Sequence, residues 1–119
     1  AYASGGRIDG ELVQLIRWPA SRSSAGRALG AMVRGMALRP ARATAPQLLT
    51  RSQQPMLLLW GRRDRLVPPV IAQRVVQQAP AGLVHLHWFE ELGHCPHDEA
   101  PEIFNTALIA WLKQQSPTR

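Results

Sequence analysis

The sequence predicts an α/β fold in which two parallel strands are flanked by helices. Residues 56–60 form a continuous apolar run of strand length, which is typical of a strand buried on both faces of a parallel sheet. Residues 83–88 alternate between apolar and polar side chains, which is the pattern of a strand with two different faces. A helical pattern lies between these segments, as a crossover between parallel strands requires.

The first half of the chain predicts two helices and a linker. Residues 8–16 place aliphatic side chains on one helical stripe, and Pro19 ends this segment. Residues 24–38 repeat the pattern, with apolar side chains spaced three or four positions apart. Those side chains belong to Leu29, Met32, Val33 and Met36. Residues 39–46, with the sequence RPARATAP, predict a linker.

The second half of the chain alternates strands with helices. Residues 69–79 predict a helix, with Pro69 near its start and Pro80 directly after it. Residues 101–114 predict the strongest helix, because apolar side chains cover a wide face. The strand at 83–88 has an apolar face and a histidine face, and we expect the histidine face to be solvated or covered by a helix. The two faces carry Val84, Leu86 and Trp88 on one side and His85 and His87 on the other.

Two parallel strands with two helices make a poor free-standing sheet, so we expect further strands beside this unit. The chain begins at Ala1 rather than at a methionine, which is typical of a processed product or a fragment. Its polar, glycine-rich N-terminus lacks the basic start and apolar segment of a signal peptide. We therefore expect the remainder of a larger fold upstream of these residues.

Composition and charge narrow the class of protein. The 119 residues carry fourteen basic and eight acidic side chains, for a net charge of +6. Most of the basic residues are arginines scattered over residues 7–65 without a dense run, so we do not expect nucleic-acid binding. No apolar run approaches the roughly 18–20 residues of a membrane span. The single cysteine forms no internal disulfide, which suits a reducing compartment and predicts a cytoplasmic protein.

Two polar residues follow the predicted strands where functional groups collect in α/β sheets. Asp64 lies in the loop after the first strand, and His94 lies in the loop after the second. A strand–helix–strand crossover separates them, so we expect both at the same sheet edge. A carboxylate oxygen of Asp64 should then lie roughly 2.6–3.2 Å from an imidazole nitrogen of His94. A carboxylate that accepts a hydrogen bond from the Nδ1 atom of a histidine fixes its tautomer, so His94 is a candidate general base.

Three neighbours of His94 suggest other sites, which we consider less favoured. His97 and Asp98 complete a possible ligand set, but the H-x-x-H spacing on a loop lacks the helical geometry of zinc sites. We therefore expect no metal, and we expect His97 to pack or to hydrogen-bond in support of the loop. Cys95 has no separate histidine to activate it, so we expect a buried small residue rather than a nucleophile.

For four further residues around the two loops we expect structural roles. Glu99 and Glu102 fall at the start of the helix predicted over residues 101–114, where carboxylates stabilise the helix dipole. Gly61 and Gly93 follow the two strands, and each is expected to permit a tight turn from strand to loop.

The same segments carry a family resemblance. "PMLLLWGRRDRLVPP", followed by "LGHCPHDEAPEIFN" and a terminal amphipathic helix, resembles the C-terminal half of an α/β-hydrolase over residues 53–114. Within that superfamily, "GHCPHDE.PE" and the upstream "DGELVQLIRWPA" are most similar to the cyanobacterial and plastid branch that includes pheophytinase-like hydrolases.

The resemblance implies roles and a division of the chain. It makes Asp64 the acid and His94 the base of a catalytic triad, with no cofactor and no metal. Residues 1–52 then correspond to the end of a helical cap or lid with its linker, and residues 53–119 to the C-terminal part of the hydrolase core. The implied reaction is hydrolysis of a small, apolar ester.

The chain departs from the family pattern at the nucleophile. The family places it in a G-x-S-x-G elbow, and none of the six serines lies in that context. The loop that forms the oxyanion hole is also missing, so we expect the chain alone to be inactive. Two alternatives remain open. One is an epoxide or haloalkane hydrolase fragment with an aspartate nucleophile, and the other is a non-catalytic binding module with the hydrolase fold.

Overall fold

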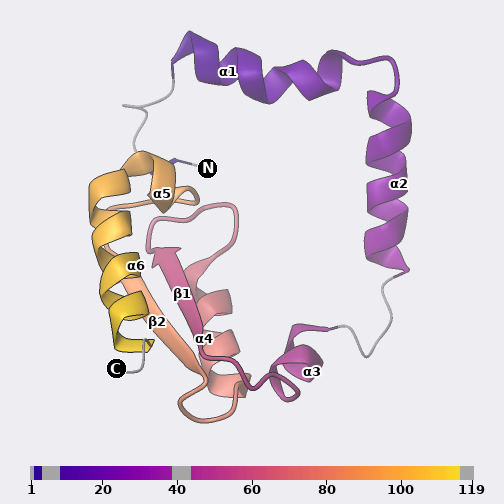
Figure 1. The fold of residues 1–119 in the computed structure, drawn as a ribbon. Helices are drawn as coiled ribbons and strands as arrows, with labels where there is room; N and C mark the ends of the chain where they lie inside the picture. The colour runs from indigo at the N-terminus through magenta and orange to yellow at the C-terminus, as the bar shows by residue number, and fades with distance from the viewer. Residues whose placement is uncertain (1, 4–8, 39–43, 116–119) are drawn as a thin grey trace.

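A computed structural model of the chain describes residues 2–3, 9–38 and 44–115. The fold is α/β, with two parallel strands and flanking helices, which confirms the predicted fold class. None of the helices in the described ranges combines the length and the hydrophobicity that a bilayer-spanning segment requires. The elements follow in the order α1 (Gly10–Arg17), η2 (Trp18–Ser21), α2 (Ala25–Ala37), α3 (Ala45–Leu49), β1 (Met56–Gly61), α4 (Pro69–Gln78), β2 (Val84–Phe89), α5 (Pro96–Glu99) and α6 (Pro101–Gln115) (Figure 1).

The two strands form a parallel pair joined through α4. Their register runs from Met56 opposite Val84 to Gly61 opposite Phe89. Figure 1 shows the pair between α6 and α4, with both strands ending on the side where α5 lies. The predicted crossover is therefore confirmed, and the loops that follow β1 and β2 leave the sheet at the same edge.

Helices cover the two faces of the strand pair. On the histidine face of β2, the rings of His85 and Trp111 lie 6.3 Å apart, and those of Phe89 and Phe104 stack at 5.9 Å. These contacts place α6 on this face, so it is covered in part by a helix although His85 and His87 stay exposed. On α4, which contacts both strands, the side chain of Ala72 is fully buried.

The interior of the described part is small. Its buried apolar side chains are those of Leu49, Ala72, Phe89 and Pro96. The residues of β1 from Met56 to Trp60 are only half-buried, so the expectation of a strand buried on both faces is not met there. The reason is that β1 pairs, among the described residues, with β2 alone. Its second edge carries no neighbouring strand in this part of the chain.

The segment from α1 to α2 forms an arm that stands away from the strands (Figure 1). The Asp9 side chain accepts the N–H of Leu12 at 2.7 Å, so α1 begins at Gly10; part of the helix predicted over 8–16 lies outside the described residues. The helix predicted over residues 24–38 is confirmed as α2. Large apolar side chains remain exposed along this arm, from 38% at Val13 to 79% at Leu38.

The predicted linker is only partly testable. Residues 39–43 lie outside the described part of the chain, and residue 44 precedes α3 as its N-cap. Ala45 and Pro46 are helical, so the linker prediction is wrong for these two residues. Proline is well tolerated in the first turn of a helix, where no intrahelical partner for its missing N–H is required.

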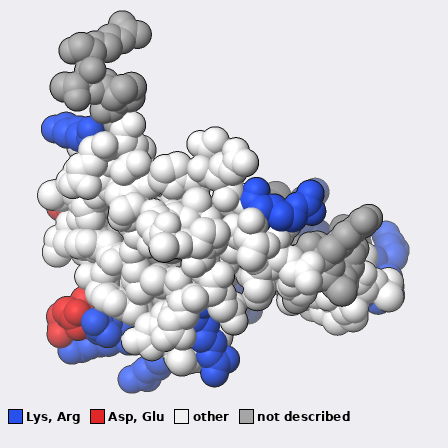
Figure 2. Space-filling model, turned by 90° about the horizontal axis from the view of Figure 1, so that it is seen from below, with Lys and Arg blue, Asp and Glu red and all other residues white. Residues whose placement is uncertain are grey.

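Basic side chains are distributed over the surface in separate groups. On the face seen in Figure 2, the arginine and lysine side chains are divided by uncharged surface. Two arginines are paired with glutamates: Arg62 Nε lies 2.8 Å from Glu90 Oε1, and Arg63 is paired with Glu91. The described part of this face therefore lacks the continuous basic stripe that accompanies nucleic-acid binding.

We expect the exposed apolar arm to make the isolated chain self-associate and bind hydrophobic dyes. Replacing Leu29, Met32 and Met36 with glutamine should lower dye fluorescence and shift sedimentation toward monomer. The control is Arg27→Gln, on the opposite face of α2 at 100° per residue, which should leave both unchanged. A monodisperse monomer without dye binding would contradict the expectation and would favour a complete domain.

Candidate functional site

The loops after β1 and β2 are joined backbone to backbone. The Arg62 N–H donates to the carbonyl of Phe89 at 2.9 Å, and the Arg63 N–H donates to the carbonyl of Leu92 at 2.9 Å. The guanidinium of Arg62 also lies over the ring of Trp88, 4.4 Å from its centroid. The hydrogen bonding of the sheet thus continues past the ends of the strands and brings the two loops together.

Gly61 is the point of closest approach between the loops. A Cβ atom at this position would overlap the carbonyl oxygens of Leu92 and Gly93, and it would lie 2.7 Å from the carbonyl carbon of Leu92. The glycine is therefore required because a second backbone crosses it, and not for the tight turn that the sequence suggested. Among the described residues, the glycine with a positive φ is Gly82, at 76°.

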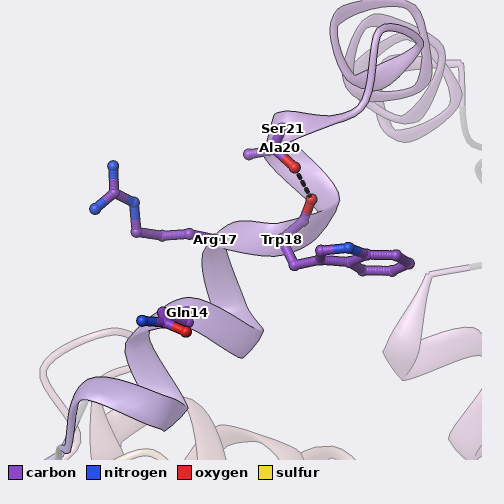
Figure 3. A pocket seen from close by; sticks show the side chains of 5 residues that line it. All are labelled: Gln14, Arg17, Trp18, Ala20 and Ser21. Atoms are coloured by element: carbon purple, nitrogen blue, oxygen red, sulfur yellow. Dashed lines mark hydrogen bonds between the residues drawn. The ribbon is translucent and has the colours of Figure 1, made fainter.

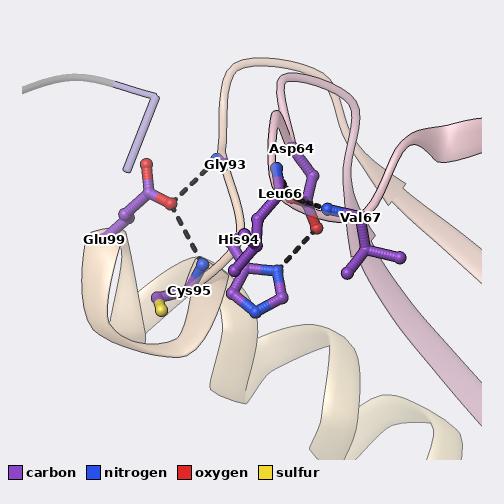
Figure 4. A network of polar contacts seen from close by, with 7 residues as sticks. All are labelled: Asp64, Leu66, Val67, Gly93, His94, Cys95 and Glu99. Carbon is purple, nitrogen blue, oxygen red and sulfur yellow. Dashed lines mark hydrogen bonds and ion pairs between the residues drawn. The ribbon is translucent and has the colours of Figure 1, made fainter. Parts of the chain in front are cut away.

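Asp64 is held in place by four hydrogen bonds. Its side chain is buried, with 4% exposed, and Oδ1 accepts the N–H groups of Leu66 and Val67, each at 2.8 Å. Its own N–H donates to the carbonyl of Gly61 at 3.2 Å. Oδ2 lies 2.8 Å from Nδ1 of His94 (Figure 4). The expected hydrogen-bond distance between Asp64 and His94 is confirmed.

The surroundings of Asp64 keep its carboxyl group ionised at neutral pH. Burial alone would raise the pKa of Asp64, but the hydrogen bonds from His94, Val67 and Leu66 outweigh it and hold the pKa below its ordinary value. An ionised carboxylate accepts from Nδ1 and favours the tautomer in which the other ring nitrogen has a free lone pair. It also stabilises the imidazolium that forms when His94 takes up a proton.

The imidazole of His94 is accessible beside Asp64. Its side chain is 34% exposed, whereas that of Asp64 is 4% exposed. In Figure 4 the second ring nitrogen points away from the carboxylate. A cavity of about 160 Å³ adjoins the pair. The residues that line it are Leu59, Trp60, Gly61, Asp64, Val67, His94 and Pro96.

Glu99 has a different role from the one expected. It ends the short helix α5, and its Oε1 atom accepts the N–H groups of Gly93 at 2.8 Å and of Cys95 at 3.3 Å (Figure 4). Glu99 therefore lies in α5 and not at the start of the helix predicted over residues 101–114, whereas Glu102 lies in the first turn of that helix, α6. The signal that could have revealed α5 is Pro96 followed by acidic residues, which is typical of a helix start.

The other neighbours of His94 do not join the pair. The ring of His97 packs edge-on against Phe104, with ring centroids 5.8 Å apart, as we expected from the sequence. Cys95 is half-buried, and burial, with the charges of Glu99 and Asp98, raises the pKa of its thiol. A thiol with a raised pKa is a poor nucleophile at neutral pH. Over the described residues, His, Cys, Asp and Glu side chains form no cluster of three suited to a metal ion.

A second pocket lies on the N-terminal arm, along α1 and η2 (Figure 3). It has a volume of about 460 Å³ and is lined by Gln14, Arg17, Trp18, Ala20 and Ser21. The Ser21 hydroxyl donates to the carbonyl of Trp18 at 2.7 Å. Because these lining residues include no histidine or carboxylate, they offer no base to activate that hydroxyl.

The chain matches one protein family over most of its length. The model of the alpha/beta hydrolase family matches residues 3–107. The chain is 34% identical over 56 residues to the chloroplastic pheophytinase of Arabidopsis thaliana, across 47% of the chain and 11% of that protein.

Among the solved structures that resemble the chain are two enzymes. One is MGS-MChE2, an alpha/beta hydrolase enzyme from a metagenome of lagoon sediments at Mar Chica, Morocco. The match has a TM-score of 0.67 and 25% identity, over 89% of the chain and 46% of that protein. The other is a thermophilic esterase from Thermogutta terrifontis, with a TM-score of 0.57 and 30% identity, over 67% of the chain and 28% of the esterase. The chain thus spans less than half the length of each of these relatives.

We expect Gly61→Ala to destabilise the chain, because the new methyl group overlaps backbone atoms that have little freedom to move. Overpacking of this kind typically costs about 1–3 kcal/mol in the free energy of unfolding. Gly26→Ala in α2 is the matched control: nothing lies within 4 Å of its Cβ position, and alanine favours a helix. Urea unfolding measures both, and a Gly61→Ala variant as stable as the parent would refute the close crossing.

The lowered pKa of Asp64 predicts a loss of stability in acid. A carboxyl group whose pKa is lower in the folded state contributes stability that is present above its unfolded pKa, about 3.9, and is lost as the pH falls through the folded value. The free energy of unfolding should therefore drop below about pH 4 in the parent and drop less steeply in Asp64→Asn. The exposed Glu102→Gln variant should follow the parent, and equal slopes in the parent and Asp64→Asn would disprove the prediction.

Proposed function

The chain belongs to the alpha/beta hydrolase family, and from this premise we propose that Asp64 and His94 are the acid and the base of a triad that hydrolyses an ester. The observation that carries the proposal is the 2.8 Å contact between Asp64 Oδ2 and His94 Nδ1 at the carboxyl ends of two parallel strands. Functional groups of α/β sheets gather at this edge. Asp64 is buried and His94 is accessible, as an orienting acid and a working base require.

In the proposed reaction, His94 moves protons while Asp64 keeps it oriented. With Nδ1 donating to Asp64, the other nitrogen takes the proton of an attacking hydroxyl as that oxygen bonds to the ester carbon. The imidazolium then returns the proton to the departing alcohol, which leaves an acyl-enzyme. In the second half, His94 takes a proton from water as the water attacks the acyl carbon, and the nucleophile recovers the proton on release of the acid.

We further propose that the nucleophile and the oxyanion donors come from polypeptide that is not among these 119 residues. The sequence has no G-x-S-x-G element, and the relatives are more than twice as long as the part that matches. Among the described residues, no strand pairs with the second edge of β1. This supports the arrangement, because a half-buried strand of apolar residues fits the interior of a larger sheet.

We also propose that the chain consists of two regions. Residues 1–52 are assigned to a helical cap with its linker, and residues 53–119 to the C-terminal part of the core. The exposed apolar side chains of α1 and α2 support the cap, since they offer a surface for an apolar substrate or for the missing core. The likeness to a pheophytinase and to an esterase favours a small, apolar ester as the substrate.

The test uses the chain alone and the chain extended by its upstream coding sequence, each assayed on p-nitrophenyl esters. The 119 residues alone should be inactive, and the extended protein should be active. In the extended protein, Asp64→Asn should lower kcat by about 10⁴-fold, because an amide presents the wrong group to Nδ1, and His94→Ala should be at least as damaging. His97→Gln, three residues further along the chain, is the control and should keep its activity.

Three outcomes would contradict the proposal. Activity in the isolated chain that disappears with His94→Ala would show that no further nucleophile is needed. Full activity in the Asp64→Asn protein would remove the acid from the mechanism. An upstream G-x-D-x-G element with epoxide or haloalkane turnover would replace ester hydrolysis, and an extended protein without turnover on any of these would indicate a binding module.

A further inference from the structure

The backbone around His94 is held by one carboxylate. Oε1 of Glu99 accepts the N–H groups of Gly93 and of Cys95, which are the two residues that flank the histidine (Figure 4). Its Oε2 atom accepts the N–H of Ala3 at 2.8 Å. One half-buried side chain therefore contacts both sides of His94 and a segment more than ninety residues away in sequence.

We propose that Glu99 is a positioning residue that sets the place of the His94 imidazole through the backbone. The proposal rests on the proposed function only in that His94 is the working base. Asp64 fixes the rotation of the ring, but it acts on Nδ1 and leaves the path of the main chain undetermined. Glu99 supplies that missing constraint, because it accepts the N–H groups of the residues immediately before and after the histidine.

The chemistry of these contacts favours a strong constraint. Hydrogen bonds to an ionised acceptor are shorter and stronger than those between neutral groups. Gly93 is buried, so its N–H would lose its partner without Glu99, and a buried donor without a partner drives local rearrangement. Gly93 is also fixed from the other side, where its carbonyl lies against Gly61. The histidine loop is thus held between a glycine contact and a carboxylate.

The role also extends to the N-terminal segment. Beside the bond from Ala3 to Glu99, the Tyr2 hydroxyl donates to Asp98 on the same short helix. The same carboxylate that positions His94 therefore binds the start of the region assigned to the cap. Glu99→Gln separates the two functions, since its amide keeps one oxygen for Gly93 and Cys95 but presents an NH₂ group to the N–H of Ala3.

The experiment is NMR on the 119-residue chain, with no need for turnover. The readouts are the Nδ1–H signal of His94, hydrogen exchange at the Gly93 amide, and hydrogen exchange in β1 and β2. We expect Glu99→Ala to broaden or abolish the Nδ1–H signal and to speed Gly93 exchange at least about fivefold, as for one net hydrogen bond. Exchange in the strands should stay as in the parent. Glu99→Gln should keep the signal and the Gly93 protection, and Glu102→Ala is the matched control.

The remaining outcomes are decisive. Equal loss of protection at Gly93 and in the strands would make Glu99 a general stability residue and overturn the proposal. So would an unchanged Nδ1–H signal in a folded Glu99→Ala chain, or its loss in a folded Glu99→Gln chain. If Glu99→Ala does not fold, Glu99→Met keeps the length without the acceptor and takes its place. If neither folds, the carboxylate is needed for the whole fold and the positioning role is rejected.

Failure of the proposed function gives a different result. In that case Asp64→Asn would leave ester turnover of the extended protein unchanged, while the NMR comparison of Glu99 variants would still decide whether Glu99 positions His94. Conversely, a catalytic Asp64–His94 pair with an unchanged Nδ1–H signal in Glu99→Ala would reject only the role of Glu99.

Discussion

The crossing of one loop backbone over Gly61 sets the geometry on which the site depends. A side chain at this position would overlap the carbonyls of Leu92 and Gly93. Because glycine has none, the second loop can pass directly against the end of β1. Backbone hydrogen bonds and the pairing of Arg62 with Glu90 then continue the contact between the loops. The short distance between Asp64 and His94 follows from this crossing, since each side chain is carried by one of the two backbones.

Much of this arrangement could be predicted from the sequence, because it depends on long, regular patterns of apolar and polar residues. The apolar run of β1, the alternation in β2 and the wide apolar face of α6 each extend over enough residues to define a period. The topology then placed Asp64 and His94 at one edge without knowledge of any distance. The alternation in β2 identifies the face that carries His85 and His87, but the cover of this face by α6 depends on residues distant in sequence.

The features that escaped prediction are short or depend on residues distant in sequence. Helix α5 has four residues, too few for a hydrophobic period, so the sequence pattern predicts Glu99 at the start of the helix that follows. The need for glycine at position 61 arises from a backbone more than thirty residues away, which no local turn rule contains. The apolar run of β1 predicts more burial than the structure shows, because such a run fits a strand with neighbours on both edges and β1 has one neighbour among the described residues.

The site is built from partners that are far apart along the chain, and this has a consequence for its folding. Asp64 and His94 are separated by thirty residues, and Glu99 reaches back to Ala3 across ninety-six. Contacts of such sequence separation form only after the intervening chain has been ordered, because the entropy of closing those loops must be overcome first. We therefore expect the imidazole to reach its carboxylate late, once β2 has paired with β1. A collapsed chain in which the strands have not yet paired would hold the same residues without a site.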